Sequence, residues 1–258
     1  METKGLAVKS AVLFALLSPS PVAPAQLESY VIEPKPPQAQ SREELRAYLD
    51  VTQAAEPQRT IELGARFVQN FPRSEFLAQV YRRQMHAHRN LGDAERTIQA
   101  GEKARSSNPF DVDTLLTLAS VLPGQSGETR GADTVLDRAE DYALRALQEL
   151  ATLKASRSVR LANWLAFLRR QRASAHESLG VVAFQRGEYR KSVQEFELST
   201  QDNLDAEGSQ LFRLGVAYQY VGENEKAISA LERAVELGPD VVSAKAQAQL
   251  QQLRKPVP

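Results

Sequence analysis

The feature that constrains this chain most is a helix-forming pattern that occurs twice, 35 residues apart. Leu179-Gly180 recurs as Leu214-Gly215, and Gly187-Glu188-Tyr189 recurs as Gly222-Glu223-Asn224. In both copies apolar residues come every third or fourth position, as on one face of an α-helix, and the glycine-containing turn separates two such stretches. Because a single helical hairpin cannot cover its own apolar face, a period of this length predicts stacked helix pairs.

The second helix of each copy adds a small, a large and a small residue at the same offset. These positions are Ser192, Phe196 and Ser199 in the first copy and Ala227, Leu231 and Ala234 in the second. With Gly238-Pro239 closing the second copy, the sequence resembles the tetratricopeptide repeat (TPR) family. The resemblance implies an all-α fold, a right-handed α-solenoid of helical hairpins with a C-terminal capping helix.

The resemblance extends over residues 41–254 and divides the chain into units. It is strongest in the two copies described above, and weaker units precede them. The predicted units span about 41–72, 74–109, 113–150, 159–205 and 206–240, followed by a cap at 241–254. Together with the last residues they form one helical repeat domain, 41–258, whose third unit is interrupted by a loop at 121–131.

The residues before position 41 have a different composition. Residues 1–25 combine early lysines, the apolar run 11–17 and the small residues Ala23 and Ala25, which together are typical of a secretory signal peptide. The Pro-rich segment 26–40 predicts an extended linker. We therefore expect cleavage near Ala25 and export to the periplasm or the extracellular medium. No run reaches the roughly 20 apolar residues of a membrane span, so no transmembrane segment is predicted.

Composition and motifs argue against several functional classes. The chain has 32 basic residues (Lys and Arg) and 32 acidic residues (Asp and Glu), and this balance disfavours a nucleic-acid partner. Cysteine is absent, and His86 and His88 are two residues apart, which places them on different faces of a helix. No nucleophile, phosphate-binding or metal motif is present. We predict no catalytic residue, no cofactor and no metal, and hence no enzyme.

The TPR resemblance implies that the first helix of each unit lines a concave groove. Carried over by position, the partner-binding residues would be Phe184, Phe212, Val216, Gln219, Tyr220, Arg82 and Arg89. The aromatic members have a second interpretation, packing against neighbouring helices. Local basic clusters, among them Arg169, Arg170 and Arg172, are read either as a solvated face or as a site for an acidic partner or anionic polymer.

These features predict a non-catalytic, exported adaptor or scaffold that holds a protein or peptide partner on its concave face. The alternative is a homo-oligomeric structural or assembly component of the cell envelope. In that case the Ala- and Gln-rich stretch 241–254 would join the ends of two arrays.

Overall fold

The chain is built from helices that run back and forth along a single array. The computed structural model describes residues 36–126, 132–156, 159–202 and 207–254, so the predicted signal segment 1–25 and most of the linker 26–40 lie outside the described residues. Within these ranges there are eleven α-helices and one short 3₁₀ helix, which confirms the all-α prediction. The α-helices are α3 (Arg42–Gln53), α4 (Pro57–Asn70), α5 (Leu77–Asn90), α6 (Ala94–Ser107), α7 (Val112–Val121), α8 (Ala132–Thr152), α9 (Leu161–Gln185), α10 (Tyr189–Asp202), α11 (Gly208–Val221), α12 (Asn224–Leu237) and α13 (Asp240–Leu253), and the 3₁₀ helix is η2 (Leu122–Gln125).

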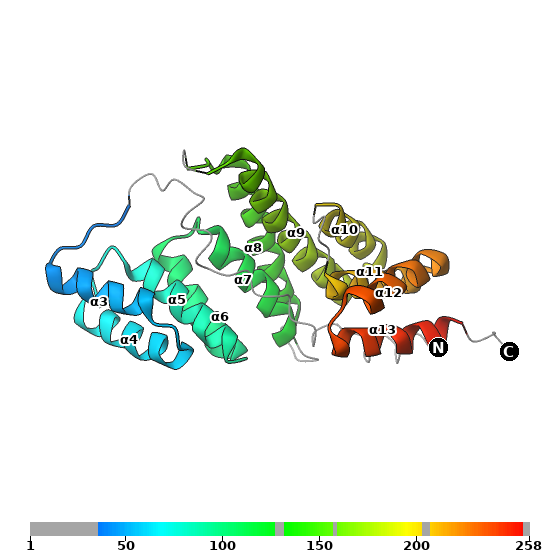
Figure 1. Ribbon diagram of the computed structural model, residues 1–258, viewed down its shortest axis with the longest axis horizontal. Coiled ribbons are helices and arrows are strands. Elements are labelled where there is room, and N and C mark those ends of the chain that lie inside the picture. Colours follow the sequence, from blue (N-terminus) through cyan, green and yellow to red (C-terminus); the bar gives the residue numbers. More distant parts are fainter. Residues whose placement is uncertain (1–35, 127–131, 157–158, 203–206, 255–258) are drawn as a thin grey trace.

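Successive helices pack in pairs, and the pairs stack into a solenoid. The pairs are α3 with α4, α5 with α6, α7 with α8, α9 with α10, and α11 with α12, while α13 packs against α12 and α11. Figure 1 shows the array extending from α3 at one end to α13 at the other. Three of the pairs are joined at a glycine in the left-handed backbone region: Gly92, Gly187 and Gly222, with φ of 73°, 77° and 82°. This conformation favours glycine, which explains why the turn residue recurs in the sequence.

Two pairs also use a glycine within the first helix to bring the second helix close. A Cβ atom added at Gly180 of α9 would lie 2.6 Å from ring atoms of Phe196 on α10. A Cβ atom added at Gly215 of α11 would lie 2.7 Å from Cγ of Leu231 on α12. Both neighbours are fully buried. The repeated Leu-Gly dipeptide therefore marks the helix crossing in each pair.

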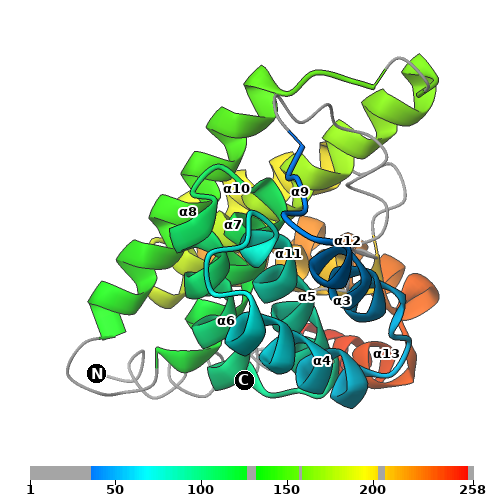
Figure 2. The same ribbon diagram turned by 90° about the vertical axis from the view of Figure 1, so that its left-hand side faces the viewer.

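The third and fourth pairs each contain one helix that is longer than usual. Helix α8 has 21 residues and α9 has 25, whereas α10, α11 and α12 have 14 each. The junction of α8 and α9 therefore stands beyond the other helices, at the top of Figures 1 and 2. Trp164, at this end of α9, packs on Phe167 in a small cluster separate from the main core clusters. Within the described residues no helix is long and apolar enough to span a membrane.

The close helix crossing leads to the first prediction. Gly180→Ala should gain about 1 kcal/mol of helix propensity but lose about 1–3 kcal/mol by overpacking against Phe196, for a net decrease in the free energy of unfolding. The control is Gly124→Ala, since nothing lies within 4 Å of the added Cβ. Urea unfolding of both variants is the measurement. A Gly180→Ala chain as stable as the Gly124→Ala chain would show that the crossing tolerates the methyl group.

Candidate partner-binding surface on the first helices

The first helices of four successive pairs, α5, α7, α9 and α11, carry polar side chains that are buried. Such residues are rare inside proteins unless they are paired. They are Arg82 and His86 on α5, Asp113 on α7, Glu177 on α9, and Gln210 and Arg213 on α11. Their contacts run between units, so they join one pair to the next.

The first group of contacts connects α5 with the start of α7. Nη1 of Arg82 donates to Oδ1 of Asp111 at 2.8 Å, and Nε2 of His86 lies 2.6 Å from Oδ2 of Asp113. Burial by itself would raise the pKa of the Asp113 carboxyl. The positive charge of His86, its hydrogen bond, and the charges of Arg82 and Arg89 outweigh this effect and lower the pKa below its ordinary value.

The second group connects α9 with α11. The guanidinium of Arg213 donates to the carboxylate of Glu177, and Nε2 of Gln210 lies 3.3 Å from the other oxygen of that carboxylate. Arg89 of α5 interacts electrostatically with both Asp113 and Glu177, while burial lowers its pKa. The two groups are therefore coupled through Arg89, and a chain of charges follows the first helices across four units.

Three of the residues predicted to bind a partner do not have the exposure that this role requires. Phe184, Phe212 and Val216 belong to the hydrophobic cluster of the C-terminal half, and Phe212 is 0% exposed. Helix α11 is buried on all sides from Gly208 to Tyr218, because α10, α12 and α13 all pack against it. The prediction that these three side chains anchor a partner is wrong in this structure, and the alternative, packing against neighbouring helices, holds for them.

The other four predicted residues lie in different environments. Gln219 and Tyr220 are half-buried near the end of α11, where the Tyr220 ring meets Phe184 and Tyr189 at centroid distances of 5.0 and 4.6 Å. Arg89 is half-buried and Arg82 is buried in its ion pairs. The structure thus gives the arginines a role between units, and the seven residues do not form one continuous patch.

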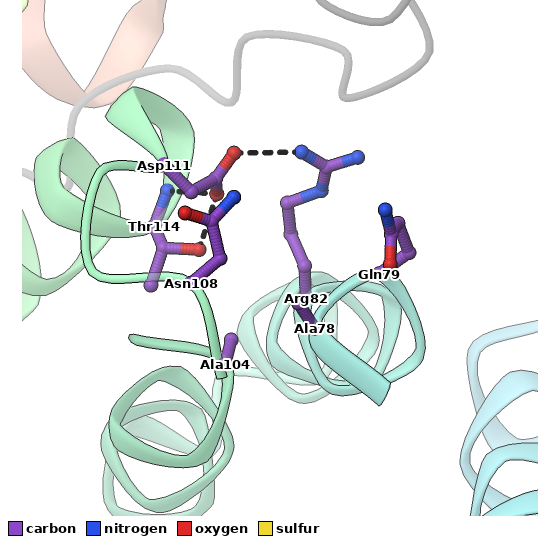
Figure 3. Close-up of a pocket in the computed structure, with 7 residues that line it drawn as sticks. All are labelled: Ala78, Gln79, Arg82, Ala104, Asn108, Asp111 and Thr114. Atoms are coloured by element: carbon purple, nitrogen blue, oxygen red, sulfur yellow. Dashed lines mark hydrogen bonds and ion pairs between the residues drawn. The ribbon is translucent and has the colours of Figure 1, made fainter. Parts of the chain in front are cut away.

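A small polar pocket lies beside the first group of ion pairs, between α5, the end of α6 and the start of α7. Its volume is about 10 Å³, roughly the space of one water molecule, and Figure 3 shows the side chains around it. It is lined by Ala78, Gln79, Arg82, Ala104, Asn108, Asp111 and Thr114. Asp111 caps α7 by accepting a hydrogen bond from the backbone N–H of Thr114 at 2.9 Å. Oε1 of Gln79 is buried and has no hydrogen-bond partner within the described residues.

Sequence reasoning identified only Arg82 among these pocket residues. Gln79 lies one turn before Arg82 on the same helix, so a search along that face could have included it. Asn108 and Asp111 come from the connection between two units, and no repeat position marks them as groove residues. Their proximity to Arg82 depends on how α7 stacks on α5.

The stacked hairpins give the chain a helical-repeat fold of the tetratricopeptide type. The solved structures that resemble the chain have this fold at low sequence identity. The assembly chaperone of RpL4 (Acl4, residues 1–338) gives a TM-score of 0.59 at 13% identity, over 83% of this chain and 84% of that one. MamA of Desulfovibrio magneticus RS-1 gives 0.57 at 12%, over 77% and 97%.

A third similar structure is TTC0263, a TPR protein of Thermus thermophilus, with a TM-score of 0.51 at 14% identity, over 82% of this chain and 97% of that one. No protein-family model matches the sequence, and no curated protein matches it. At these identities the similarity establishes the fold alone.

Burial of the aromatic residues leads to the second prediction. Phe212→Ala should lower the free energy of unfolding by about 3–5 kcal/mol, because it leaves a cavity in the core. Tyr220→Ala should cost less, since its side chain is only half-buried. Urea titration followed by circular dichroism measures both. An unchanged urea midpoint for Phe212→Ala would contradict the burial of this side chain and make it a candidate surface anchor again.

The ion pairs of Asp113 lead to the third prediction. Asp113→Asn should cost about 3–5 kcal/mol at neutral pH, because it leaves buried cations without their partner. A carboxyl whose pKa is lowered on folding stabilises the protein above its unfolded pKa of about 3.9, and this contribution is lost as the pH falls below that value. The difference between wild type and variant should therefore shrink in acid. Asp50→Asn, at an exposed position on α3, is the control and should show no such trend.

Proposed function

We propose that this chain is a non-catalytic adaptor that binds a protein or peptide partner along its first helices and acts outside the cytoplasm. The observation that carries the proposal is the pocket between α5 and α7. There the buried amide oxygen of Gln79 has no hydrogen-bond partner within the described part of the chain, and ion pairs hold the neighbouring side chains in place. A buried acceptor without a hydrogen bond costs about 1–3 kcal/mol. A ligand that donates to it would recover that energy.

The chemistry of the pocket matches a peptide backbone. Oε1 of Gln79 can accept a hydrogen bond from a backbone N–H. Oδ1 of Asn108 already accepts from the backbone N–H of Phe110 at 3.2 Å, so its Nδ2 group is the part that can donate to a backbone carbonyl. One acceptor and one donor on opposite walls suit the two polar groups of an extended chain. We place the partner segment there, and not on the buried aromatic residues of α11.

Three further observations support the proposal. The fold is shared with structures that include an assembly chaperone, whose task is defined by a protein partner. The signal-like residues 1–25 support export, with cleavage near Ala25. The absence of catalytic sequence motifs supports a role in binding rather than in chemistry.

One observation favours the alternative, homo-oligomeric assembly in the cell envelope. Leu237 and Val241 are 57% and 63% exposed at the junction of α12 and α13, the C-terminal end of the array. Apolar side chains at the end of a solenoid can be covered by another copy of the chain. The two functions differ in where contact occurs. Self-assembly would use the end of the array, whereas the adaptor would bind its partner at the pocket.

The fourth prediction tests the adaptor. Gln79→Ala combined with Asn108→Ala should reduce capture of a partner from envelope and secreted extracts of the native host, while the helical signal stays unchanged. A captured protein is then purified and its affinity for wild type and variant is measured directly. The loss should be about tenfold or more, because two hydrogen bonds contribute about 0.5–1.5 kcal/mol each. Gln247→Ala, at an exposed position on α13, is the control.

The two functions give different results in this experiment. If wild type and the pocket variant bind the partner equally, the pocket is not the binding site. If nothing binds directly and the solution mass rises with concentration, the chain assembles with itself. Leu237→Ser with Val241→Ser should then restore a monomer.

A further inference from the structure

The projection formed by the end of α8 and the start of α9 differs in charge from the rest of the molecule. The chain as a whole carries equal numbers of acidic and basic residues. Between residues 150 and 176, however, it has six Lys and Arg and no Asp or Glu. We call the described part of this projection, residues 153–156 and 159–172, the α8–α9 tip.

The basic side chains of the tip are not used for ion pairs. Within the described residues, Lys154, Arg160, Arg169, Arg170 and Arg172 have no acidic partner, and all five residues are exposed. Elsewhere on the surface some arginines are paired. Arg186 contacts Glu140 and Asp137, for example. Others, such as Arg190 and Arg233, are exposed singly. Solvent-facing charges usually contribute little to stability, so stability does not account for five unpaired cations at one end of a helix.

The tip also exposes apolar side chains next to these cations. Leu161 and Leu165 are 70% and 41% exposed and lie one turn apart on α9. Continuing along the same side of the helix, at spacings of four and three, come Arg169 and Arg172. This stripe of α9 is therefore apolar at the outer end and basic toward the body of the protein.

Aromatic residues support the outer end from within. Trp164 and Phe167 stack at a centroid distance of 5.4 Å and pack with Leu153, Val159 and Leu168 in a cluster of their own. The Trp164 and Phe167 side chains are both buried, so they contribute packing at this end of α9 and do not lie at the surface. Trp164 is the chain's single tryptophan.

The start of α9 is unfavourable by the ordinary rules of helix stability. Arg160 occupies the N-cap position without a capping hydrogen bond, and the first turn contains no acidic residue. A cation at this end opposes the helix dipole, whose positive end lies there. The sequence of the tip therefore points to a requirement other than folding.

From these features we propose that the α8–α9 tip docks on the surface of an anionic phospholipid bilayer. Leu161 and Leu165 enter the boundary between headgroups and acyl chains, and Arg169 and Arg172 contact lipid phosphates. With a rise of 1.5 Å per residue, Leu165 and Arg169 are about 6 Å apart along the helix.

The arrangement fits a bilayer better than it fits an acidic protein or polymer. A polyanion would be bound by the cations alone and would leave Leu161 and Leu165 exposed to water. A protein groove would need a concave complement, whereas the tip is a projection (Figure 2), and Leu161 and Leu165 are exposed on it. The tip lies apart from the pocket between α5 and α7, so membrane docking and partner binding would take place on different parts of the molecule.

The fifth prediction uses the full chain and vesicles of two compositions, pure phosphatidylcholine and an equal mixture of phosphatidylcholine with phosphatidylglycerol. The chain should float with the anionic vesicles and much less with the neutral ones. Bromine-labelled acyl chains in the anionic vesicles should quench the fluorescence of Trp164. The apolar run 11–17 is present in every variant, so its own binding to vesicles is the same throughout. The test therefore depends on the quenching of Trp164 and on differences in vesicle binding between variants.

Two pairs of substitutions separate the contributions of the tip. Arg169→Glu with Arg172→Glu should reduce anionic-vesicle binding by more than tenfold, since each cation at such a surface contributes about fivefold. Leu161→Ser with Leu165→Ser should abolish the quenching of Trp164. The controls make the same changes at exposed residues elsewhere, Arg190→Glu with Arg233→Glu and Leu45→Ser with Leu49→Ser, and should leave binding and quenching as in wild type.

Several results would overturn the proposal. One is the absence of quenching in anionic vesicles by a chain that circular dichroism shows to be folded. Another is an equal loss of binding in the control variants. A third is tight binding to polyglutamate that competes with vesicles and is unaffected by the leucine substitutions, which would assign the tip to an acidic polymer or protein.

Discussion

The structure depends on the close crossing of the two helices within each pair. At Gly180 and Gly215 the first helix has no side chain, and a large residue of the second helix, Phe196 or Leu231, occupies that space. The resulting pair is tight but leaves an apolar face uncovered, so the next pair must pack against it. Repetition of this contact generates the solenoid and aligns the first helices in one row.

That alignment determines which surface is available for binding. Polar side chains on successive first helices meet across the boundaries between units, and the ion pairs of Asp113 and Glu177 hold α5 against α7 and α9 against α11. The same contacts remove Arg82 and Arg213 from the solvent. What remains accessible is the projection formed where α8 and α9 exceed the standard length. The amide oxygen of Gln79 is buried beside the ion pairs and has no hydrogen-bond partner within the described residues.

The fold could be predicted from the sequence to a greater extent than the site could. The helix pairs, the turn glycines and the long first helix of the fourth pair all follow from local spacing, which is a property of consecutive residues. The burial of Phe212 and Val216 does not follow from local spacing, because it depends on α10, α12 and α13 packing around α11. A first helix with one solvent-facing side would have exposed them. Asn108 and Asp111 were missed for a similar reason, since they join Gln79 only when two units stack.

The sequence by itself determined the class of this protein, since the recurrence of Leu-Gly, the turn glycine and the small-large-small pattern allows only stacked helical hairpins. It also placed an excess of positive charge between residues 150 and 176. Only the tertiary structure decided which aromatic side chains are core, which charges are paired and which end of a helix projects. These properties depend on the distances between units, and no local pattern of residues encodes how many neighbours surround a given helix.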